Sequence, residues 1–100
     1  MNIEMDRTYA QSSRWRLRSD VAVVAHDERV TVLALEPVDA VPLELAGPGL
    51  EIWALVDGQR DLAEIVGRLG DKFGIGAEAL LPDVVKFMEQ LEAASILERY

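Results

Sequence analysis

The sequence predicts a single α+β domain in which a three-stranded antiparallel sheet is followed by three helices. Two short β-branched runs separated by a polar turn come first, and a third short run alternates in polarity. After Gly47-Pro48-Gly49 the apolar residues recur at helical spacing. The chain has 100 residues, half of them hydrophobic, which is enough for one core without metals or disulfides.

The first two strands are predicted at residues 21–25 and 30–35. Both runs are short and rich in β-branched residues, and the polar turn 26–29 separates them, so we expect a β-hairpin. A second turn follows at residues 36–39, where Pro37 sets the backbone φ angle.

The third strand is predicted at residues 41–45. Its alternation places Val41, Leu43 and Leu45 on one half-buried face. Proline cannot donate to a β-ladder, so Pro42 indicates that this strand lies at a sheet edge with residue 42 facing outward. One donor is then missing from the edge, and Glu44 must supply most of the donation.

Three helices are predicted after the strands. The first runs over residues 50–56 and ends at Asp57-Gly58. The second begins at Asp61, because Asp61 followed three residues later by Glu64 has the pattern of a capping box. Gly74 is suited to the C-terminal end of this helix. The third runs from after Gly76 to about residue 94, with Pro82 in or near its first turn.

The helices and the closing segment supply most of the expected core. The expected core positions are Ile52, Trp53, Val56, Leu62, Ile65, Val66, Leu69, Phe73, Leu81, Val84, Val85, Met88, Leu91, Ile96 and Leu97.

The segment before the first strand has a different composition. Residues 1–19 are polar and rich in Arg and Ser, so we expect a flexible arm there and the folded domain over residues 20–100. Trp15 in this arm is interpreted as a lid over the core, with contact to a partner as the alternative. The arm has a charge balance of +2 and the remainder of −10, within a net charge of −8.

The sequence contains no recognisable catalytic or metal-binding motif. The chain has no cysteine, and its one histidine, His26, lies in the hairpin turn, which excludes thiolate sites and a His-based metal centre. No serine lies in a nucleophile-elbow pattern, and no P-loop or dinucleotide fingerprint is present. We therefore expect no enzyme, no cofactor and no metal.

The compartment is predicted from the same features. The N-terminus is charged and lacks the apolar stretch of a signal peptide, and no apolar run is long enough to cross a bilayer. We expect a cytoplasmic protein that does not associate with membranes.

Order and spacing of motifs point to a known family. The stretch 41–58 is similar to the strand, Pro/Gly turn and helix ending in Asp-Gly of PqqD-like proteins. The stretch 61–66 resembles the start of their second helix, and 83–91 with Ile96-Leu97 resembles their third helix and closing apolar pair. The chain is thus identified over about residues 20–98 as resembling the PqqD-like family of RiPP recognition elements.

This resemblance implies a winged-helix-turn-helix-like fold and a function in peptide binding. Such proteins bind the leader segment of a ribosomally made precursor peptide, which adds as a strand against the third strand and lies along the third helix. They present the precursor to a separate modifying enzyme, such as a radical-SAM protein, a leader protease or a cyclase. Carried over to this sequence, the implied peptide-binding residues are Val41, Pro42, Leu43, Glu44, Leu45, Asp83, Lys86, Phe87, Gln90 and Leu91.

Two other functions are alternatives to leader-peptide binding. A protein-docking or dimerisation module without a leader peptide stays open, because an edge strand can pair with its twin in a homodimer. DNA binding by a winged helix requires a basic recognition helix. The third helix is acidic apart from Lys86, and the body of the chain repels phosphates, so we expect no nucleic-acid partner.

Overall fold

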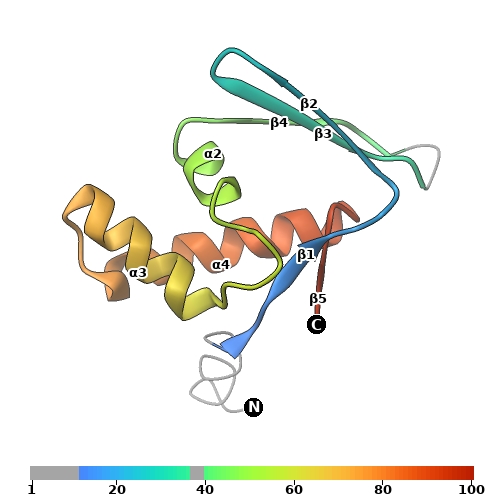
Figure 1. Cartoon of the computed structure of the whole chain (residues 1–100). Coiled ribbons are helices and arrows are strands. Elements are labelled where there is room, and N and C mark those ends of the chain that lie inside the picture. The colour runs from blue at the N-terminus through green and yellow to red at the C-terminus, as the bar shows by residue number, and fades with distance from the viewer. Residues whose placement is uncertain (1–11, 37–39) are drawn as a thin grey trace.

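The computed structural model describes residues 12–36 and 40–100. Among these, eight elements form an α+β fold with two antiparallel sheets and three helices (Figure 1). In chain order they are β1 (Trp15–Leu17), β2 (Val21–His26), β3 (Arg29–Ala34), β4 (Leu43–Ala46), α2 (Pro48–Trp53), α3 (Leu62–Phe73), α4 (Ala77–Ala93) and β5 (Leu97–Arg99).

The larger sheet has the order β2-β3-β4, so the third predicted strand lies at an edge as expected. The β2–β3 hairpin closes through the pair His26 and Arg29, and Asp27 in its two-residue turn has a φ of 55°. A positive φ at this position is typical of the primed turns that match strand twist. Strand β4 begins at Leu43, so the expectation that Pro42 lies inside it is wrong. Pro42 therefore lies just outside the ladder with β3, where its missing N–H removes no hydrogen bond to β3.

The second sheet was not predicted. Strand β1 pairs antiparallel with β5, and Trp15 lies opposite Arg99. Trp15 is 2% exposed, and its Nε1 donates to Glu92 Oε2 at 3.0 Å. The Ser13 carbonyl also accepts a hydrogen bond from the Leu62 amide at 2.9 Å. The interpretation of Trp15 as a buried cover is supported, whereas the part of the expected arm from residue 12 onward belongs to the folded body; residues 1–11 lie outside the described residues.

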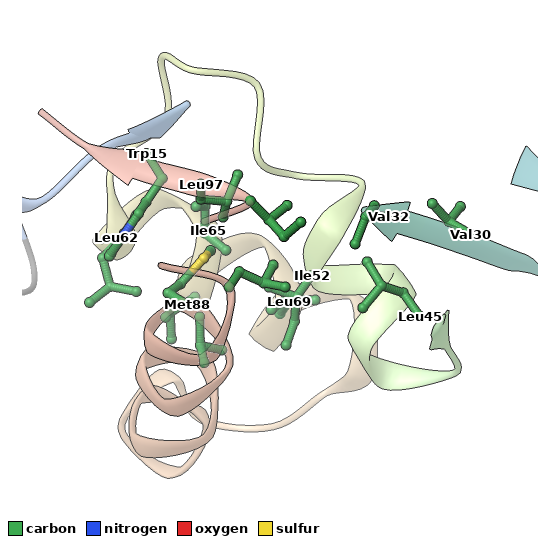
Figure 2. Close-up of a cluster of buried hydrophobic side chains, with 14 of the residues drawn as sticks. Trp15, Val30, Val32, Leu45, Ile52, Leu62, Ile65, Leu69, Met88 and Leu97 are labelled. Atoms are coloured by element: carbon green, nitrogen blue, oxygen red, sulfur yellow. The ribbon is translucent and has the colours of Figure 1, made fainter. Parts of the chain in front are cut away.

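The core joins the two sheets through the helices. Figure 2 shows Trp15 and Leu62 at one side of the cluster and Val32 and Leu45 at the other, with Ile65, Leu69, Met88 and Ile52 of the helices between them. Most positions predicted from helical spacing are buried, because both strongly periodic helices turn one apolar face inward. The buried hydrophobic residues of these helices are Ile52, Leu62, Ile65, Val66, Leu69, Val84, Met88 and Leu91.

Some expected core positions lie at the surface. Phe73, in the last turn of α3, is 48% exposed, and Val41 is 71% exposed because it precedes β4 instead of belonging to it. Trp53 and Val56 are only partly buried, since α2 ends at Trp53 and does not reach residue 56.

Helix boundaries follow local chemistry. Asp61 accepts from the Glu64 amide and Glu64 accepts from the Asp61 amide, so the predicted capping box is confirmed. Gly74 ends α3 with a φ of 65°, as its position predicted. Pro82 lies inside α4, five residues beyond Ala77 and past the first turn, so its predicted placement is wrong.

Candidate functional site

An apolar groove lies between the β4 edge and the C-terminal half of α4. Its volume is about 560 Å³. The residues that line it are Leu43, Glu44, Leu45, Ala46, Gly49, Phe87, Gln90, Leu91, Ala93 and Ala94. Except for Glu44 and Gln90 these residues carry no polar side chain, so the groove suits apolar groups of a ligand.

The backbone of β4 presents free hydrogen-bonding groups at this groove. In the hairpin the Leu35 amide donates to the Asp20 carbonyl at 2.8 Å, which fixes which residues of β3 bond to β2. Successive residues of a strand direct their backbone groups to opposite sides, so the odd-numbered residues of β3 bond to β2 and the even-numbered ones to β4. Val30 therefore bonds to Leu45, and Val32 bonds to Leu43. It follows that the N–H and C=O groups of Glu44 and Ala46 point away from β3, toward the open edge.

No backbone bond outside the sheet uses these Glu44 and Ala46 groups within residues 12–36 and 40–100. Pro42, two residues before Glu44, directs its backbone to the same side and contributes a carbonyl acceptor but no N–H donor. The edge beside the groove therefore offers two amide donors and up to three carbonyl acceptors to a further strand.

The floor of the groove belongs to the core, and its wall is more accessible. Leu45 is 6% exposed and Leu91 is 1% exposed. Phe87 is partly buried, and its ring lies against Gly49, where an added Cβ would come within 3.1 Å of Phe87 Cε1. Phe87 therefore lines the groove and also packs against the core.

Charge at the groove is low. Arg29 Nη1 lies 3.5 Å from Glu44 Oε2, but both side chains are more than half exposed, so this ion pair contributes little stability. In the described part of the chain no three His, Cys, Asp or Glu side chains are placed to hold a metal ion. None of its helices is long and apolar enough to cross a membrane.

The family model described as coenzyme PQQ synthesis protein D (PqqD) matches residues 22–97. The chain belongs to the PqqD family. The match covers α2, α3, α4, the groove and all of the larger sheet but Val21, whereas β1 lies before it.

A solved structure has the same fold. TbiB1 in complex with the TbiA(beta) leader peptide superposes with a TM-score of 0.74 at 22% sequence identity, over 85% of this chain and 96% of that chain. A search of curated proteins found no match.

Six of the ten predicted binding residues of this PqqD-family chain line the groove. They are Leu43, Glu44, Leu45, Phe87, Gln90 and Leu91. Val41 and Pro42 precede the strand and lie outside the groove lining. Lys86 is exposed and also outside it. Asp83 instead lines a separate cavity of about 280 Å³ with Ile52, Phe73 and Leu80, because the groove follows only the C-terminal half of α4.

Four lining residues were missed by sequence reasoning. Ala46 lies one residue beyond the predicted end of the third strand. Gly49, Ala93 and Ala94 are the small residues of the groove lining on α2 and at the end of α4. Ala94 lies seven residues after Phe87, two helical turns along the same face, which is a spacing that the sequence contains. The small size of Ala46, Gly49, Ala93 and Ala94 leaves the space that forms the groove.

Proposed function

We propose that this chain binds the leader segment of a ribosomally made precursor peptide by strand addition at β4. The observation that carries the proposal is the open β4 edge beside an apolar groove. Membership of the PqqD family supports it, as does the shared fold with TbiB1, a protein whose solved complex contains a leader peptide. In this mode main-chain hydrogen bonds provide affinity and side-chain pockets provide selectivity.

The bound leader exchanges hydrogen bonds with Glu44 and Ala46 and accepts none at the Pro42 nitrogen. Its residues that face α4 place apolar side chains over Leu45, Phe87 and Leu91. Lys86, one residue before Phe87 on the exposed side of α4, is a further proposed contact for an acidic leader side chain at the mouth of the groove.

The proposed role is accessory and not catalytic. The chain presents the captured precursor to a separate cytoplasmic enzyme, and the fold is of the winged-helix-like kind adapted to peptide binding. Glu44 is the one ionisable side chain of the groove lining, which supports binding of a peptide over chemistry on it, since general acid–base or nucleophilic steps need paired polar groups.

A titration tests the proposal. The probe is a fluorescein-labelled peptide from the N-terminal half of a short open reading frame encoded beside this gene, and fluorescence anisotropy reports binding. Saturable binding is expected. Ala93→Trp fills the groove without removing a core atom, because Ala93 is exposed and lines it, and should weaken binding at least about tenfold.

Ala79→Trp is the matched control, since Ala79 is exposed on the same helix and outside the groove lining. Leu43→Arg and Phe87→Ala should also weaken binding, while Leu35→Arg, at a side chain that is 55% exposed, should not. Pro42→Val should preserve or tighten binding, because it restores a donor at the open edge. Equal loss of affinity in Ala93→Trp and Ala79→Trp would place the peptide elsewhere.

A further inference from the structure

The second edge of the larger sheet, strand β2, has features that the leader site does not explain. Residues 21–25 of this strand are all apolar, with no proline and no charge. Val23 is 42% exposed and Val24, on the opposite face, is 62% exposed. Proteins normally protect long apolar edges with prolines, charges or a covering element. The β4 edge has Pro42 and Glu44 at such positions, whereas β2 has neither.

The bonding groups of the β2 edge follow from the hairpin register. Because Asp20 bonds to Leu35, the groups that bond to β3 are those of the even-numbered residues of β2. The N–H and C=O groups of Val21, Val23 and Ala25 therefore point outward. Within the described residues β2 pairs with β3 alone.

The sequence of this edge is complementary to itself. In an antiparallel pair of two copies with the two-fold axis at Val23, Val21 faces Ala25 and Ala22 faces Val24, and Val23 faces Val23. All three outward-facing residues then form hydrogen-bonded pairs, about six bonds in total. Beyond the apolar part Asp20 comes opposite His26, so no like charges face each other in this register.

We propose that β2 pairs with β2 of a second copy of this chain to form an isologous dimer. The joined sheet has the order β4-β3-β2-β2-β3-β4, which covers both apolar edges at its centre. Both β4 grooves stay open at its outer edges, so the dimer carries two leader sites. This pairing does not depend on whether the β4 groove binds a leader peptide.

Site-specific cross-linking tests the register. The native chain has no cysteine, so each single-cysteine variant carries one thiol. Facing residues of a hydrogen-bonded pair have Cα atoms about 5.5 Å apart, which a disulfide can span. Mild oxidation of Val23→Cys should give a covalent dimer in high yield, whereas Ala25→Cys should not, since the two copies of residue 25 lie about 13 Å apart.

Sedimentation velocity on the full chain, from micromolar to near-millimolar concentration, tests the association without cysteines. The native chain should shift from monomer to dimer, and Val23→Lys should remove the shift because two ammonium groups meet at the axis. Val24→Lys is the matched control and should retain it, since Val24 faces Ala22. A chain that stays monomeric at every concentration, or a Glu44→Cys variant that cross-links while Val23→Cys does not, would overturn the proposal.

Discussion

The ring of Phe87 lies directly over Gly49, and the space for this contact exists because residue 49 has no side chain. A Cβ at this position would lie 3.1 Å from Phe87 Cε1 and within 4 Å of Cδ1 and Cζ. The contact joins α2 to the helix wall of the groove. The position of the ring, and with it the shape of the groove, is therefore set by a glycine on a different element.

Gly49→Ala should alter peptide binding more than stability. The methyl group must displace the ring by a few tenths of an ångström, which we expect to weaken leader affinity several-fold. Alanine favours the helix by up to about 1 kcal/mol, so the free energy of unfolding should change by less than about that amount. Anisotropy titration and urea unfolding measure the two effects. In a Phe87→Leu background Gly49→Ala should have little effect on affinity. If it weakens leader affinity there as much as in the native background, the contact between residues 49 and 87 does not set the groove.

Two glycines of α3 should respond in opposite directions to alanine. At Gly70 an added Cβ would lie 2.6 Å from the Ile75 carbonyl oxygen, so the turn after α3 must shift, and we expect a loss of about 1–3 kcal/mol. At Gly67 nothing lies within 4 Å, and alanine should stabilise the helix by about 0.5–1 kcal/mol. Urea unfolding of the pair checks this, and equal effects would contradict the close approach at Gly70.

The β1–β5 sheet should contribute strongly to stability. Trp15→Ala removes a buried ring and its hydrogen bond to Glu92, and we expect a loss of about 3–5 kcal/mol. Leu17→Ala, at a 44% exposed position on the same strand, should cost less than about 1 kcal/mol. Thermal and urea unfolding compare the two variants. A negligible effect of Trp15→Ala would mean that the segment is a dispensable arm.

Asp57 should titrate below its ordinary range. The backbone amides of Arg60 and Gln59 donate to its Oδ1 at 2.9 Å each, and these bonds, followed by the Arg60 charge, lower the pKa of Asp57 below 3.8. A depressed folded-state pKa gives a stability contribution that is present above the unfolded pKa and is lost as pH falls through the folded value. Carbon-13 NMR should show this low midpoint, and Asp57→Asn should reduce the loss of stability below about pH 4. A midpoint at or above 3.8 would exclude the two backbone bonds as its determinant.

The parts of the fold that the sequence predicted depend on local patterns. The capping box at Asp61 and Glu64 and the end of α3 at Gly74 each require only residues a few positions apart. The pairing of β1 with β5 was not predictable in this way, because three-residue strands carry almost no periodic signal and Trp15 meets Arg99 from the other end of the chain.

The site residues also divide into those predicted from short motifs and those that depend on tertiary contacts. The edge position of β4 was predicted from Pro42, and Leu43 to Leu45 and Phe87 were carried over from motifs of the family. Gly49 was missed because its role depends on a tertiary contact with Phe87. Asp83 was carried over from the same motifs but lines a separate cavity, because the sequence does not show how far along α4 the groove extends.

Amide hydrogen exchange measured by NMR, with and without the leader peptide, tests strand addition at β4 most directly. In the free protein the outward amides of Glu44 and Ala46 should exchange quickly, because no partner in the sheet protects them. The account predicts that the leader slows these two amides strongly, while Leu43 and Leu45, already bonded to β3, change less. Saturating peptide that leaves Glu44 and Ala46 unprotected would contradict strand addition at this edge.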